Sequence, residues 1–332
     1  MTKNIGHKKN ISTGPTPGIE IKRILICRPN KRLGNLLLFT PLVQEVEATF
    51  PGCKIDLFVK GNLASSVFKN YENINRIIQQ PVKPFEHLLK EMQGWLFIKR
   101  NHYDLAINVI NHSSSGRLST QFANSTYKFF GDVNEDELSN NTDKQHAAKL
   151  SVYALRNYLE QEGFPKNDNP VPKLNLKLSA SEIAEGKVIL NKLVKNEKKT
   201  ICLFTFATGD KCYSDEWWKS FYERLKTEYQ NYNIIEILPV QNVSGISFKA
   251  PTFSNKDIRK VGALIANTKV FICADGGIMH LASSVNTPTI GLFSVTDKNT
   301  FQPYNDKSIG IKTDETDINE LTRILNNILT TN

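Results

Sequence analysis

Short apolar runs alternate with longer amphipathic stretches from Ile21 onward. Runs of four to eight residues rich in Ile, Val and Phe are typical of buried strands, and the stretches between them have the period of helices. This alternation predicts parallel sheets covered by helices. In the first half we expect strands over 23–27, 54–59, 74–79, 103–110 and 127–131, and a first helix over roughly 35–49.

The pattern is interrupted once and then restarts. A long helix predicted over 144–164 leads into a segment in which Pro165, Pro170 and Pro172 favour an extended linker. Later strands are expected over 200–206, 233–238, 269–274 and 288–293, and a last helix over about 317–329. The predicted organisation is a basic, disordered lead-in (1–20), a first domain (21–164), the linker (165–176) and a second domain (177–332).

Both predicted domains have the architecture of doubly wound α/β units. A chain of 332 residues, of which 40% are hydrophobic, can bury a sizeable core, and its length favours two domains over one. Ligands of such sheets bind at the carboxyl ends of the strands. We therefore expect two Rossmann-like domains facing each other across a cleft, with the functional residues in the loops that follow the strands.

The charge is positive and unevenly spread. The chain carries a net charge of +9, and residues 1–60 hold ten Lys and Arg against four acids. This excess favours an anionic partner, whether nucleic acid, a membrane face or a phosphorylated substrate. Nucleic acid is disfavoured because the basic segment lacks interleaved aromatic residues. No apolar run approaches the roughly 20 residues of a membrane helix, so we expect a cytoplasmic protein, at most peripheral to a membrane.

The five cysteines form no C-x-x-C pair, and three of them lie in apolar strand-like runs. A thiol in such a run usually behaves as a small hydrophobic group. This usage indicates a reducing compartment and no zinc site.

Two loops in the first half carry candidate binding residues. In "RPNKRLGN" (28–35), Gly34 permits close backbone approach, and Arg28, Lys31 and Arg32 add positive charge before a helix start that suits an anion. In "INHSSSGR" (110–117), His112 and Arg117 offer donors to an anionic substrate. The alternatives are an ordinary strand–helix turn with solvated basic side chains, and a flexible surface loop.

The loop "FATGDKCYSDEWW" (206–218) follows the first strand of the second half. Thr208, Gly209 and Lys211 could hold a phosphate by hydroxyl, amide and ammonium together. The loop lacks the Gly-Lys-Ser/Thr of a Walker motif, so ATP hydrolysis is not indicated. Trp217 and Trp218 are interpreted as core residues more readily than as stacking platforms.

The most informative segment is "VFICADGGIMHLASSVNTPTIGLFSVTD" (270–297). Its strand ends at Asp275, Gly276 and Gly277 follow, and a helix begins whose first turn carries His280. The helix start favours negative charge, whereas Asp275 repels a phosphate but can accept hydrogen bonds from sugar hydroxyls. This division fits a nucleotide sugar. In the alternative interpretation Asp275 is a helix cap and His280 a satisfied helix residue.

At these residues the chain resembles a known family. The segments 23–59 and 272–297 are similar to the opening and the donor-site signature of the ADP-heptose:lipopolysaccharide heptosyltransferases, glycosyltransferase family 9. The segment 204–218 is similar to the family's phosphate-binding lysine segment, and the resemblance runs from about Ile21 to about Asn305. It implies a metal-independent, inverting glycosyltransferase of the GT-B type, with a nucleotide-sugar donor in the C-terminal domain and no cofactor.

The resemblance also implies residue roles and partners. Lys211 and Thr208 would hold the donor diphosphate, Asp275 would contact the donor sugar, and His280 would support the loop. The remaining donor-binding residues would be Gly276, Gly277, Ile278 and Met279, which present amides, and Thr296 and Asp297, which close the pocket. The N-terminal domain of a monomer would bind a phosphorylated, lipid-linked glycan through Arg28, Lys31, Arg32, Gly34 and Arg117, near the anionic inner-membrane surface.

Two positions depart from the family pattern. Asn35 stands where the family has the Asp proposed as the base, and an amide cannot take that proton. Another group would then serve, with Asp275 and His112 as candidates, or Asn35 only orients the acceptor, or the protein binds nucleotide or glycan without turnover. Gly276 replaces a common Ser or Thr, which favours a different sugar. A nicotinamide-dependent oxidoreductase is a weak alternative because the dinucleotide fingerprint is incomplete.

Overall fold

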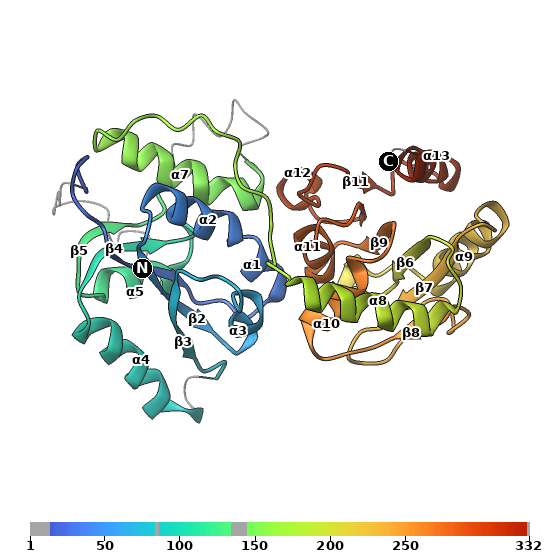
Figure 1. Ribbon diagram of the computed structural model, residues 1–332, viewed down its shortest axis with the longest axis horizontal. Coiled ribbons are helices and arrows are strands. Elements are labelled where there is room, and N and C mark those ends of the chain that lie inside the picture. The colour runs from blue at the N-terminus through green and yellow to red at the C-terminus, as the bar shows by residue number, and fades with distance from the viewer. Residues whose placement is uncertain (1–13, 84–85, 134–144, 331–332) are drawn as a thin grey trace. The chain divides into compact units, whose positions relative to one another are not determined.

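The computed structural model describes residues 14–83, 86–133 and 145–330, and it divides into two compact units (Figure 1). The first unit comprises residues 1–172 and the second residues 173–332. Each unit is a parallel sheet with helices on both faces. The boundary falls inside the segment 165–176.

The first unit contains a five-stranded parallel sheet in the order β3-β2-β1-β4-β5. Its strands are β1 (Arg23–Arg28), β2 (Lys54–Lys60), β3 (Ile74–Gln80), β4 (Tyr103–Asn108) and β5 (Ser125–Phe129). These match the five strands expected from the apolar runs to within a few residues. Because β1 lies at the centre of the sheet, the loop that follows it emerges in the middle of the carboxyl edge.

Helices cover both faces of this sheet (Figure 1). They are α1 (Leu33–Leu37), α2 (Thr40–Thr49), α3 (Leu63–Val67), α4 (Leu88–Arg100), α5 (Ser114–Phe122) and α7 (Ala147–Gln161). The helix expected over 35–49 is broken into α1 and α2. Pro41 has no N–H to bond the preceding turn, and the Thr40 hydroxyl donates to the carbonyl of Leu37 at 2.8 Å instead.

Both ends of this unit are fastened to α7. Residues 1–13 of the lead-in lie outside the described residues, but Gly14 and Pro15 are buried, and a Cβ added at Gly14 would lie 2.3 Å from Glu162. Arg156 forms a buried ion pair with Glu45 at 2.7 Å and donates to the carbonyl of Asn169 at 2.6 Å. Residues 14–15 and the first part of the 165–176 segment are therefore packed rather than free.

The second unit contains a six-stranded sheet in the order β11-β10-β9-β6-β7-β8. The expected strands are β6 (Thr200–Phe204), β7 (Asn233–Ile237), β9 (Val270–Ala274) and β10 (Thr289–Phe293); two edge strands, β8 (Thr252–Phe253) and β11 (Ile309–Lys312), were not predicted. The helical segments are α8 (Ala180–Val194), the 3₁₀ turn η3 (Gly209–Lys211), α9 (Asp215–Glu228), α10 (Ile258–Ile265), α11 (Gly277–Ser284), α12 (Lys298–Phe301) and α13 (Ile318–Thr330).

Helices α9 and α13 pack on one face of this sheet through an apolar cluster. Trp218 is fully buried there, and Trp217 packs against the cluster at its edge. This confirms the interpretation of both tryptophans as core residues. Cys202 and Cys273 lie in β6 and β9, where burial raises the pKa of each thiol well above its usual value. No helix of the described ranges is long and apolar enough to cross a membrane.

Candidate functional site

Three side chains predicted for the donor site meet at the carboxyl edge of the second sheet. The ammonium of Lys211 donates to Oδ2 of Asp275 at 2.5 Å, and the hydroxyl of Thr296 donates to the same oxygen at 2.6 Å. Asp275 is 5% exposed, whereas about a third of the Lys211 side chain is open to solvent. We call these three residues the Asp275 cluster.

Strand order explains why these residues meet although they are far apart in sequence. Lys211 follows β6, Asp275 follows β9 and Thr296 follows β10, and these three strands are neighbours in the sheet with β9 in the middle. The loops after parallel neighbours emerge side by side. The Asp275 amide donates to the carbonyl of Leu292 at 2.9 Å, which fixes the carboxylate between the other two loops.

Asp275 is not the cap of the helix that follows it. The N-cap of α11 is Gly276, and the Asp275 carboxylate is occupied by Lys211 and Thr296. Oδ1 of Asp275 makes no hydrogen bond within the described residues. One carboxylate oxygen is thus held by the protein, and the other remains available as an acceptor.

The start of α11 supplies free backbone donors beside Asp275. Gly277 and Ile278 lie in the first turn, where N–H groups have no partner within the helix. Met279, in contrast, donates its amide to the carbonyl of Gly276 at 3.1 Å, and its side chain is buried. His280 is also buried. The helix start can therefore offer two of the expected amides to an anion.

Gly276 is not required by its backbone conformation. Its φ of 179° is extended backbone that any residue adopts, and a Cβ built there would meet only the Ala274 carbonyl, at 3.9 Å. A Ser or Thr would therefore fit at this position. The missing hydroxyl is a chemical difference from the family pattern and not a structural necessity.

The remaining predicted donor residues have different surroundings. Thr208 is exposed beside η3 and makes no capping hydrogen bond. Asp297 caps α12 by accepting from the amides of Asn299 and Thr300, and the hydroxyl of Thr300, together with these amides, lowers the pKa of its carboxyl group. The Asp297 carboxylate is thus engaged locally.

Sequence reasoning missed a further group beside this cluster. The Tyr213 hydroxyl lies 2.8 Å from the hydroxyl of Thr313, which follows β11, and burial raises the pKa of Tyr213. Ser294 bridges from the β10 loop to the carbonyl of Asp210 at 3.5 Å. Tyr213 and Ser294 lie within the segments 206–218 and 270–297 but were given no role, and Thr313 lies in neither segment. Only the strand order reveals that these residues lie close together.

Arg28 is the most unusual residue at the carboxyl edge of the first sheet. Its side chain is 8% exposed at the end of β1, and its Nε is buried without a hydrogen-bond partner. No carboxylate within the described residues pairs with its guanidinium, and burial lowers its pKa to about 10. A buried cation without a counterion is unfavourable, so this position suits an anionic ligand.

The neighbouring predicted residues are more accessible. Gly34 is buried and Asn35 half-buried in α1, and the Asn35 side chain makes no hydrogen bond within the described residues. Lys31 and Arg32 are exposed on the preceding loop. His112 is exposed after β4, the strand next to β1. These side chains share one edge of the sheet, and in the described part of the chain they make no hydrogen bonds to one another.

Arg117 is held by its own unit. It is 2% exposed, forms an ion pair with Asp132 at 2.7 Å and donates to the carbonyl of Phe130 at 3.2 Å and to Oδ1 of Asn111 at 3.0 Å. These contacts fasten α5 to the segment after β5. The guanidinium is therefore committed to holding the structure together, in contrast to that of Arg28.

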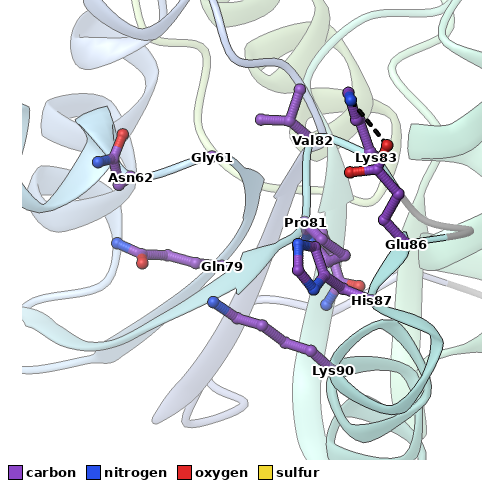
Figure 2. Close-up of a pocket in the computed structure, with 10 residues that line it drawn as sticks. Gly61, Asn62, Gln79, Pro81, Val82, Lys83, Glu86, His87 and Lys90 are labelled. Carbon is purple, nitrogen blue, oxygen red and sulfur yellow. Dashed lines mark hydrogen bonds and ion pairs between the residues drawn. The ribbon is translucent and has the colours of Figure 1, made fainter.

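A pocket of about 460 Å³ opens at the carboxyl ends of β2 and β3 (Figure 2). Gly61 lies on its rim, and a Cβ there would lie 3.5 Å from that of Lys31, so the pocket adjoins the basic loop 28–35. Lys83 is ion-paired with Glu86 at 2.7 Å. The other lining residues are Asn62, Gln79, Gln80, Pro81, Val82, His87 and Lys90. Most of the pocket surface is apolar, and His87 and Lys90 add basic groups to it.

Known proteins resemble this chain in sequence and in fold. Residues 253–325 match the family model for glycosyltransferase family 9 (heptosyltransferase). Lipooligosaccharide heptosyltransferase 2 of Haemophilus influenzae is 24% identical over 325 residues, covering 87% of this chain and 88% of that protein.

Two solved structures share the fold. The glycosyl transferase family 9 protein of Veillonella parvula has a TM-score of 0.75 at 14% identity, covering 95% of this chain and 99% of that one. The Escherichia coli heptosyltransferase WaaC with ADP has a TM-score of 0.67 at 15% identity, covering 92% and 99%. The two Rossmann-like units are those of the GT-B fold, and the chain is similar to glycosyltransferase family 9, the heptosyltransferase family, most directly over residues 253–325.

Proposed function

We propose that the protein transfers a heptose or a related sugar from a nucleotide diphosphate donor, with ADP-heptose favoured, to a lipopolysaccharide core or a similar phosphorylated, lipid-linked glycan. The observation that carries this proposal is the Asp275 cluster beside the start of α11. The structure of WaaC with ADP favours this donor, and the name of the H. influenzae relative favours this acceptor.

Different residues of the site suit the two parts of such a donor, the diphosphate and the sugar. A diphosphate is bound by the Lys211 ammonium and by the free amides of Gly277 and Ile278, all of which are donors. Asp275 would repel a phosphate, but its Oδ1 can accept a hydrogen bond from a sugar hydroxyl. Oδ2 holds Lys211 in place before the donor arrives, which lowers the cost of ordering that flexible side chain.

The acceptor is assigned to the first unit because that unit holds the uncompensated positive charge. Arg28 lacks a counterion within the described residues, and Lys31 and Arg32 are exposed beside the pocket of Figure 2. A phosphate or carboxylate of the acceptor would neutralise Arg28. In this proposal the protein works as a monomer at the cytoplasmic face of the inner membrane, where such an acceptor is presented.

The acceptor hydroxyl must lose a proton, and Asn35 cannot take it. Asp275 already accepts two hydrogen bonds on one oxygen, and its other oxygen is assigned to the donor sugar. His112 is exposed at the carboxyl edge next to β1, and a neutral imidazole is a general base that works near pH 7. We therefore assign the base to His112 and the orientation of the acceptor to Asn35.

We further propose that transfer inverts the anomeric centre, as the family resemblance implies. We also propose that transfer needs no metal, because Lys211 and the start of α11 supply positive charge for the departing diphosphate. Product configuration determined by NMR tests the first part. An unchanged rate in excess EDTA is expected for the second, and a rate restored only by a divalent cation would contradict it.

The decisive test is acceptor-dependent release of ADP from ADP-heptose. The expected result is release that requires a heptose-free lipopolysaccharide core and falls to background when Lys211 is replaced by Ala. Donor binding without acceptor-dependent release would mean a member of the family that binds nucleotide or glycan without turnover. Release from another nucleotide sugar would keep the site and change the donor.

A further inference from the structure

An exposed apolar surface covers the outer side of α4 and continues onto α5. On α4, Leu89 is 78% and Met92 56% exposed, and both lie on the face opposite the buried Ile98. The α5 side chain of Phe122 packs edge-on against Trp95 of α4, with ring centroids 5.5 Å apart. This surface, which we call the α4 patch, comprises Leu88, Leu89, Met92, Leu96, Leu118 and Phe122.

The inner side of α4 packs against the core of the first unit. Gly94 and Ile98 are buried, and Trp95 packs on Phe58 of the sheet with ring centroids 5.4 Å apart. The exposed aliphatic side chains therefore do not belong to the core of the unit. Water-soluble monomers rarely leave so many neighbouring apolar side chains exposed unless the surface binds something.

The charges around the patch are positive. Lys90, Lys99 and Arg100 are exposed on the same helix, and the Lys99 ammonium lies 5.5 Å from the centre of the Phe122 ring. The acid of this helix, Glu91, points inward and accepts from the Trp95 indole at 3.0 Å. An apolar stripe bordered by Lys and Arg is typical of helices that lie in the interface of an anionic bilayer.

We propose that the α4 patch docks the first unit on an anionic lipid bilayer, with α4 lying parallel to the membrane surface. The helix has 13 residues, far short of the roughly 20 needed to span a bilayer, so it binds the surface only. The pocket of Figure 2 includes His87 and Lys90, at the start of α4, so docking holds this pocket near the lipid surface.

The test is co-sedimentation of the full chain with sucrose-loaded vesicles of phosphatidylcholine, with and without phosphatidylglycerol. Wild-type protein is expected to bind the anionic vesicles, more weakly as salt is raised. The double variant Leu89→Glu/Met92→Glu should lower the partition coefficient roughly tenfold or more, because it removes apolar contact and adds like charge. Lys90→Gln/Lys99→Gln should lower it mainly on the anionic vesicles.

The matched control is Ile183→Glu/Val188→Glu on α8 of the second unit, where Val188 is 53% exposed. It adds the same charge and should leave binding unchanged. Thermal melting of each variant establishes that it folds. Three results would overturn the proposal: no binding of wild-type protein, equal loss in the α8 control, or self-association that the α4 variant abolishes. The proposal rests on the proposed function only for its lipid-linked acceptor, and the assay contains no sugar nucleotide, so its failure leaves the transfer reaction untouched.

Discussion

The two units share an architecture but differ in how their carboxyl edges handle charge. In the second unit the cation is matched: Lys211 is paired with Asp275, and Thr296 fixes the same oxygen. In the first unit Arg28 is buried with no acid beside it in the described ranges, and Asn35 supplies only an amide. The same architecture thus presents a charge-neutral site in the second unit and a cationic site in the first.

This difference bears on which unit binds the nucleotide-sugar donor and which binds the phosphorylated acceptor. An ion pair such as Lys211–Asp275 is preorganised. Its cation can bind the phosphates of a nucleotide sugar, and its carboxylate can accept from the sugar hydroxyls. An unmatched buried cation weakens its own unit and is stabilised only when an anion arrives. This difference supports the proposal that the donor binds the second unit and the phosphorylated acceptor the first.

Replacing His112 should have the largest effect. If His112 removes the acceptor proton, His112→Gln lowers kcat about a hundred- to ten-thousand-fold while leaving the donor KM nearly unchanged. A larger loss of kcat in Asp275→Asn than in His112→Gln, with donor affinity retained in Asp275→Asn, would move the base to Asp275.

Lys211→Ala should lower donor affinity roughly ten- to a hundredfold, because it removes a charge-assisted contact to the diphosphate. Asn35→Asp should leave donor affinity unchanged and alter turnover. Both can be measured by steady-state kinetics with ADP-heptose, with Lys211→Arg as the charge-conserving control. Equal loss of donor affinity in both variants would contradict the division between the units.

Arg28→Met should stabilise the protein by about 1–3 kcal/mol, since an apolar side chain of similar length replaces an unpaired buried cation. This corresponds to a rise in Tm of a few degrees. We expect inorganic phosphate to stabilise the wild type by neutralising Arg28, and the same change should abolish that stabilisation and raise the acceptor KM. A lower Tm would mean that Arg28 has a counterion in its own unit.

Gly276→Ser should have the smallest effect, a change of about fivefold in sugar preference, because one added hydroxyl contributes about one hydrogen bond. The extended backbone and the space around Gly276 accommodate the side chain, so stability should be unchanged. Competition between ADP-heptose and a second ADP-sugar measures the preference. A loss of stability would show that the glycine is structural.

Most of the fold could be predicted because strand and helix periods differ and the buried strands are continuous apolar runs. All five strands of the first sheet were expected from this pattern. The break in the first helix was not predicted, because the apolar period continues across it, although Pro41 marks its position. The edge strands β8 and β11 were missed because they are short and, in β11, Gly310 interrupts the apolar pattern.

The candidate site could be predicted only in part. That Lys211, Asp275 and Thr296 follow strands is visible in the sequence, but their meeting depends on β10, β9 and β6 being neighbours, which spacing does not specify. The engagement of Arg117 by Asp132 depends on how the segment after β5 folds back. The pocket of Figure 2 was not foreseen because its lining residues belong to no motif.

The assignment of the donor to the Asp275 cluster can be tested by thermal melting of wild-type, Lys211→Ala and Asn35→Asp protein. Each protein is melted with ADP, UDP, GDP, CMP or NAD at the same millimolar concentration. A ligand at a hundred times its Kd adds about 2.7 kcal/mol to the free energy of unfolding. We expect a selective rise in Tm with ADP that survives in Asn35→Asp and is largely lost in Lys211→Ala. No shift with any nucleotide, or an ADP shift that Lys211→Ala retains in full, would contradict the assignment of the donor to the Asp275 cluster.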